Sequence, residues 1–220
     1  MKYLKYLSGL ALAAVLFACA GDPEGTLIKG ELDNAANLKV YLDKVSINGA
    51  NEVLANAPID ADGSFALGFL EPLDPGVYQL RVGAQKALLT LEEGDHKVSI
   101  DGDLSTLGTY EFSVEGSAAS QELVTTMNGL SKKSVSVDDL KATVEGMKNP
   151  QSAAYLAFNT LARAGAQGLP VHKVAVERLD AADPMKATYA NFVQGLENQL
   201  ARQKSAELIQ VGQPAPNILA

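Results

Sequence analysis

Cysteine is almost absent from this sequence, because Cys19 is the single thiol among 220 residues. One thiol excludes an internal disulfide, a zinc site built from several thiolates and a Cys-x-x-Cys redox pair within these residues. The fold must therefore be held together by burial of apolar side chains. Apolar residues make up 47% of the chain, which is ordinary for a globular protein and argues against disorder.

Histidine is also scarce, and tryptophan is absent. His96 and His172 are the only histidines, and neither has a second histidine or a cysteine at metal-ligand spacing. We interpret both as surface or packed side chains. The lack of tryptophan weakens the idea of an aromatic platform for sugars. We assign four aromatic residues at helical spacing to the core instead: Tyr155, Phe158, Tyr189 and Phe192.

Positive charge is in short supply. The chain has 18 lysines and arginines against 26 aspartates and glutamates, a net charge of −8. Loss of Lys2 and Lys5 with a cleaved leader would take this charge to −10. A chain this acidic repels phosphate backbones, so we expect no nucleic-acid partner.

The longest apolar run, Leu7–Phe17, is short, whereas a membrane-spanning helix needs about 20 apolar residues. Lys2 and Lys5 precede the run and Ala18-Cys19 follows it, which is the layout of a secretory signal. A cysteine directly after a small residue resembles the lipobox of bacterial lipoproteins. Phe17 stands where that family more often has a small or aliphatic residue. An ordinary signal peptide with a cysteine near its end by chance is the alternative.

The lipobox resemblance implies that residues 1–18 are a signal peptide and that Cys19 is the site of lipid attachment. In that family the cysteine carries a diacylglycerol and an amide-linked acyl chain. Several acyl chains anchor a protein stably, whereas one holds it only marginally. We therefore expect a protein of the bacterial cell envelope, attached to a membrane on the periplasmic or cell-surface side. Residues 19–25 are small, acidic and interrupted by Pro23, and are interpreted as a flexible tether.

Residues 26–116 have the period-two pattern of strands with one buried face. Leu38, Val40 and Leu42, for example, alternate with polar or half-polar neighbours. Short strands at regular spacing predict an antiparallel β-sandwich. The expected turns between the strands are Asn48-Gly49, Asp62-Gly63, Asp74-Pro75-Gly76, Glu93-Gly94-Asp95 and Asp101-Gly102.

The period changes at Gly116, and residues 117–208 predict four or five short amphipathic helices. Ser136 and Asp139 have the spacing of a capping box, and Asn149-Pro150 has that of a cap followed by proline. Asp183-Pro184 is expected to open the last and longest helix. The fold class is therefore α+β, with a sandwich followed by a helical region.

Several short motifs follow one another in a recognisable order. They are Gly30-Glu31-Leu32, Val40-Tyr41-Leu42, Asp60–Phe65, Leu91–Asp95, Val114–Ser117, Asn149–Ser152 and Val211–Pro216. Together they resemble the N-terminal portion of TlpA-like thiol-disulfide oxidoreductases. These are envelope lipoproteins with a β domain of unknown function ahead of a thioredoxin-like domain. The resemblance covers residues 26–220.

In that family Val-Gly-x-x-Ala-Pro introduces the thioredoxin fold, and Asp-Phe usually follows where this chain has Asn217-Ile218. The resemblance thus implies that residues 209–220 start a thioredoxin-like domain whose Cys-x-x-Cys lies beyond Ala220. It assigns no catalytic residue, cofactor or metal to the 220 residues. This chain is then the non-catalytic part that positions the redox domain, and it is inactive alone.

Other candidate sites have simpler interpretations. Asp60–Glu71 spaces its oxygens like a calcium loop, but Phe65 stands where the bend of such a loop needs glycine, so a hairpin is expected. Glu92–Asp95 and Asp101–Asp103 could pair carboxylates for acid–base catalysis, but solvated turns explain them more simply. No Gly-x-Ser-x-Gly nucleophile elbow is present.

Two other functions stay open at this point. One is a self-standing lipoprotein that binds a peptide or a glycan on the sandwich. The other is a spacer or dimerisation module without a ligand. The expected partners are a membrane, through lipid on Cys19, and a protein partner or a second copy, through the β domain.

Overall fold

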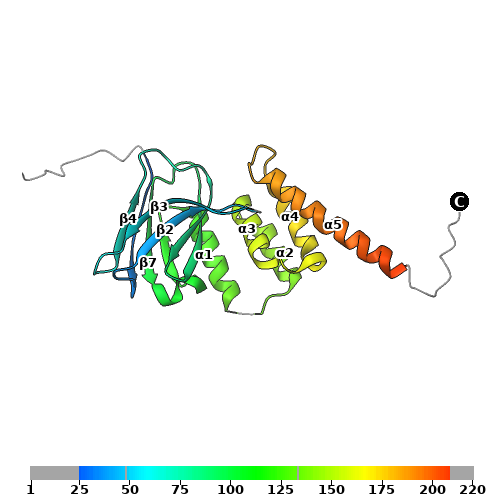
Figure 1. Ribbon diagram of the computed structural model, residues 1–220, viewed down its shortest axis with the longest axis horizontal. Coiled ribbons are helices and arrows are strands. Elements are labelled where there is room, and N and C mark those ends of the chain that lie inside the picture. Colours follow the sequence, from blue (N-terminus) through cyan, green and yellow to red (C-terminus); the bar gives the residue numbers. More distant parts are fainter. Residues whose placement is uncertain (1–24, 48, 133, 209–220) are drawn as a thin grey trace, which may run out of the picture.

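The computed structural model describes residues 25–47, 49–132 and 134–208. The predicted signal peptide, Cys19, the predicted tether up to Glu24 and residues 209–220 lie outside the described residues. Figure 1 shows a β-sandwich at one end of an elongated molecule and a group of helices at the other. The predicted α+β class, with a sandwich followed by a helical region, is confirmed.

The sandwich consists of two four-stranded sheets. Its strands are β1 (Leu27–Asp33), β2 (Lys39–Lys44), β3 (Glu52–Pro58), β4 (Ser64–Gly68), β5 (Gly76–Val82), β6 (Gln85–Leu91), β7 (Lys97–Asp103) and β8 (Phe112–Glu115). The first sheet has the order β4-β1-β7-β8 and the second has the order β3-β2-β5-β6. Alternate residues such as Ile28, Leu42, Leu80 and Ile100 are fully buried, as the period-two pattern requires.

One pair of neighbouring strands departs from an antiparallel arrangement. β1 and β7 run parallel, with Leu27 opposite Lys97 and Asp33 opposite Asp103. Parallel neighbours need a crossover connection. Here the chain leaves β1, forms β2 and β3 of the second sheet, returns to the first sheet as β4, and forms β5 and β6 of the second sheet before it reaches β7.

Some predicted turns have a different role from the one expected. Asp62-Gly63 and Glu93–Asp95 each connect strands that belong to different sheets, so they are corners rather than hairpins. The predicted turn at Asp101-Gly102 is wrong, because both residues lie inside β7. A Cβ atom on Gly102 would lie 2.5 Å from that of Phe112 on β8, so this glycine permits close approach of two strands.

The helical region begins directly after the sandwich. It contains α1 (Ala118–Ser131), α2 (Val137–Gly146), α3 (Pro150–Leu161), α4 (Leu169–Arg178) and α5 (Lys186–Leu208), and two 3-10 turns occur in the described chain, η1 (Leu104–Thr109) and η2 (Gly165–Gly168). The Ser136–Asp139 capping box forms as predicted. The Asn149 side chain accepts the Ser152 amide and Pro150 is the first helical residue, also as predicted.

Helices cover the outer edge of β6, the last strand of the second sheet. The Thr90 amide donates to Ser120 Oγ at 2.9 Å, and the Leu88 amide donates to the Tyr110 hydroxyl at 3.1 Å. Ser117 Oγ donates to the Thr90 carbonyl. Ser152 Oγ on α3 lies 2.8 Å from Thr90 Oγ1. These groups are buried, so side chains replace the missing neighbouring strand.

The substitution Ser120→Ala should lower the free energy of unfolding by about 1–3 kcal/mol, because the buried Thr90 amide loses its acceptor. Urea denaturation followed by circular dichroism measures this change. Ser113→Ala is the matched control, since the exposed Ser113 Oγ makes only a 3.4 Å contact to a carbonyl. Equal losses in the two variants would contradict the assignment.

Candidate functional site

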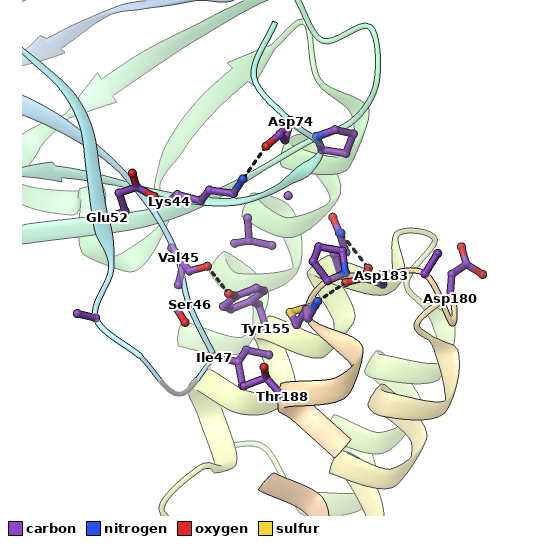
Figure 2. Close-up of a pocket in the computed structure, with 18 residues that line it drawn as sticks. Lys44, Val45, Ser46, Ile47, Glu52, Asp74, Tyr155, Asp180, Asp183 and Thr188 are labelled. Carbon is purple, nitrogen blue, oxygen red and sulfur yellow. Dashed lines mark hydrogen bonds and ion pairs between the residues drawn. The ribbon is translucent and has the colours of Figure 1, made fainter. Parts of the chain in front are cut away.

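A pocket of about 620 Å³ opens where the sandwich meets the helical region. We call it the junction pocket. Its lining comes from the end of β2 and the following loop, from the β4–β5 loop, from α3, and from the segment between α4 and α5. Figure 2 shows these segments converging on one hollow. Lining residues such as Lys44 and Asp183 lie far apart in the sequence and are brought together only by the fold.

Tyr155 ties the two sides of the junction pocket together. Its hydroxyl, on α3, donates to the Val45 carbonyl just after β2 at 2.6 Å (Figure 2). Burial raises the pKa of Tyr155, and the negative charge of Asp183 raises it further. The phenol therefore keeps its proton and remains a hydrogen-bond donor at physiological pH.

Asp183 forms part of the opposite wall. Its carboxylate accepts the Gln151 side-chain amide at 2.9 Å and the Met185 backbone amide at 2.8 Å. The latter bond supports the turn that leads into α5, which begins at Lys186 as the Asp183-Pro184 pair predicts. Asp183 forms no ion pair with any residue of the described chain.

An ion pair marks one border of the junction pocket. Lys44 Nζ lies 2.8 Å from Asp74 Oδ2. The hydrogen bond and the charge of Lys44 lower the pKa of Asp74. A second hollow of about 670 Å³ is lined by the same two residues and by Glu52, which also lines the junction pocket. Leu70, in the β4–β5 loop, lines this second hollow with 97% of its surface exposed.

His172 lies in the core of the helical region, away from the junction pocket. Its Nδ1 lies 2.8 Å from the Tyr189 hydroxyl. The rings of Phe158, Tyr189 and Phe192 surround the site, with centroids 5.1–6.1 Å apart. The predicted core packing of these aromatic residues is confirmed. Tyr155 is also buried, but it faces the junction pocket.

The acidic segments have structural partners. Glu92 Oε1 accepts the Asn149 side-chain amide, and Asp95 Oδ2 accepts the Glu92 backbone amide. Asp103 accepts the Ser105 amide and the Asn34 side chain. These contacts hold a corner between the sheets and the start of a 3-10 turn. The structure brings neither segment into the junction pocket.

The calcium-like segment Asp60–Glu71 is a corner followed by a strand. Asp62 Oδ1 accepts the amide and the hydroxyl of Ser64, and these bonds lower the pKa of Asp62. Its middle is β4, which pairs with β1 and cannot wrap around an ion. Within residues 25–208, apart from the two undescribed positions, no group of three or more His, Cys, Asp or Glu could hold a metal ion.

Comparison with known proteins adds no relative. The chain matches no protein-family model and no curated protein. Among the helices of the described chain, none is long and apolar enough to cross a membrane.

Sequence reasoning missed the junction pocket. The Asp180-Ala-Ala-Asp-Pro segment, with acids at both ends of a helix-breaking loop, was the one local signal. Nothing in the sequence places Lys44, Asp74 or Tyr155 opposite it.

Stability should fall as the pH drops below about 6.5, the ordinary pKa of histidine. Burial lowers the pKa of His172, and the Leu161 carbonyl opposes this only partly. Folded His172 therefore stays neutral while the unfolded chain takes up a proton. Its contribution is complete above about 6.5 and is lost as the pH falls toward the lowered value.

Urea midpoints measured between pH 7.5 and pH 5 test this expectation, with a loss of up to about 1.4 kcal/mol per pH unit. His172→Asn should flatten the profile. Equal slopes for His172→Asn and the parent chain would exclude His172 as the cause.

Proposed function

We propose that this chain is the lipid-anchored, non-catalytic part of an envelope thiol-disulfide oxidoreductase of the TlpA-like class. In this proposal it positions a thioredoxin-like domain away from the membrane. The proposal starts from the order of the motifs, in which a lipobox precedes a β region, a helical region and Val211–Pro216.

The two ends of the described chain provide the main geometric support. The described chain begins in the sandwich, just before β1, and leaves through α5, which extends away from the sandwich (Figure 1). A helix of 23 residues is about 34 Å long. Tyr189, Val193 and Leu196 are buried in its first part, whereas residues 201–206 are exposed. The chain thus leaves the body on a helix that projects away from the sandwich (Figure 1).

A spacer must also be stiff, and the contacts between the two regions supply this. The Ser120 and Ser152 hydroxyls bind Thr90 of the second sheet, and Tyr155 binds Val45. Buried hydrogen bonds of this kind are costly to break, because each leaves an unsatisfied polar group. The sandwich and the helices are therefore coupled rather than joined by a loose hinge.

The junction pocket favours a second candidate, a self-standing binding lipoprotein of the cell surface or periplasm. Its volume of about 620 Å³ is within the range of small-molecule sites. The gene sequence beyond the codon for Ala220 distinguishes the two candidates. A continuing frame with Cys-x-x-Cys favours the oxidoreductase, and a stop codon favours the binding protein.

In a bacterial host that processes lipoproteins, the wild-type chain should fractionate with membranes and incorporate labelled palmitate. Cys19→Ser should abolish the labelling and move the protein out of the membrane fraction, because the acyl chains are lost. Ala20→Ser is the neighbouring control and should behave as wild type. Unlabelled wild-type protein would contradict lipid attachment at Cys19.

The 220-residue chain should not reduce insulin in the presence of dithiothreitol beyond the uncatalysed rate, because it lacks a pair of cysteines. Turbidity from precipitating insulin chains measures this reaction, with thioredoxin as the positive control. Thiol-dependent catalysis by this chain would overturn its assignment as the non-catalytic part.

A further inference from the structure

We propose that the junction pocket and the second hollow together form one groove that binds an extended polypeptide segment with a basic side chain between apolar ones. We call it the junction groove. This inference stands without the oxidoreductase proposal, because it rests only on residues 44–188 of the described chain.

The two hollows adjoin each other. Lys44, Glu52 and Asp74 line both of them. The Lys44 and Asp74 side chains, which form the ion pair at this border, are 40% and 78% exposed. An ion pair this exposed is weak and can rearrange when a ligand lies across it. A ligand longer than a single side chain can therefore extend from one hollow into the other.

Both hollows have apolar walls. The apolar lining of the junction pocket includes Val45, Ile47, Val77, Pro184 and Met185, and that of the second hollow includes Leu54, Phe69, Leu70 and Leu73. Leu70 is 97% exposed, so its side chain is available to an apolar residue of a ligand.

The charge of the junction pocket selects a cation. Four carboxylates and one lysine line it, and Asp74 already neutralises that lysine. Glu52, Asp180 and Asp183 form no ion pair with a described residue. Figure 2 places Glu52 and Asp180 on opposite sides of the hollow, with Asp183 between them and nearer Asp180. A lysine or arginine side chain entering the pocket is attracted from both sides, whereas an anionic ligand is repelled.

The combined shape favours a polypeptide over a small amine. A small amine would satisfy the carboxylates of the junction pocket but would leave Leu70 and Phe69 uncovered. An extended segment presents a basic side chain to one hollow and apolar side chains to the other. Both features of the groove are then used by one ligand.

Fluorescence anisotropy with the full 220-residue chain tests the proposal. The probe is a fluorescein-labelled peptide, Leu-Ala-Arg-Leu-Ala, and its match is Leu-Ala-Gln-Leu-Ala. The arginine peptide should bind at least about fivefold more tightly, and the difference should shrink in roughly 0.5 M NaCl because salt screens exposed charges. Equal affinities, or no binding of either peptide at millimolar concentration, would overturn the proposal.

Two double variants locate the site. The double variant Glu52→Gln with Asp180→Asn should bind the arginine peptide at least about threefold more weakly, because two attracting charges are lost. Both side chains are exposed and make no hydrogen bond with a described residue, so the fold should persist. Asp101→Asn with Glu177→Gln removes the same charge from exposed positions outside the groove and should have little effect. Equal losses in the two double variants would overturn the site.

Leu70→Ser tests the second hollow. It should lower the affinity for the arginine peptide and for the glutamine peptide by the same factor. Spermidine supplies the competing small cation. Two results together would show that the pocket binds a small amine. They are displacement of the arginine peptide by spermidine at equal concentration and unchanged peptide binding in Leu70→Ser. The proposal of a polypeptide ligand would then be wrong. Failure of any of these tests leaves the oxidoreductase proposal untouched, since that proposal is tested by the gene sequence and by lipid labelling.

Discussion

The arrangement of this molecule depends on how the outer edge of β6 is satisfied. A strand at the edge of a sheet has backbone donors and acceptors on one side without a neighbouring strand. Under a cover of helices these groups cannot reach water, so each needs a partner within the protein. Thr90 finds its partners in Ser117, Ser120 and Ser152, which come from two helices and the residue that caps one of them. The same contacts that complete the sheet therefore set the position of α1 and α3.

The junction pocket depends on that placement. Once α3 is fixed against β6, Tyr155 reaches the end of β2, and the segment before α5 lies opposite. A second polar contact stabilises the outer face of the second sheet. Arg81 donates two hydrogen bonds to the buried Asp43 carboxylate and lies over the Tyr41 ring. This ion pair joins β2 to β5. The last residue of β2, Lys44, lines the junction pocket.

Local chemistry made much of the fold predictable. The caps at Ser136 and Asn149 are satisfied within three residues, so the sequence alone indicates them. Strand β6 gives a weak period-two signal, because its last five residues are all buried and do not alternate. The turn predicted at Asp101-Gly102 was wrong, because close packing of Gly102 against Phe112 overrides the turn preference of these two residues. The junction pocket was beyond prediction, since its walls meet only after both regions have folded.

The parallel pairing of β1 with β7 has a consequence for the order of events as the chain emerges. All four strands of the second sheet lie between β1 and β7 in the sequence, together with β4 of the first sheet. β1 must wait about seventy residues for its parallel partner, and closing so long a loop is slow. β1 can pair with β4 after about forty residues, so only the completion of the first sheet by β7 is late. Every strand of the second sheet has therefore been synthesised before the first sheet can be complete.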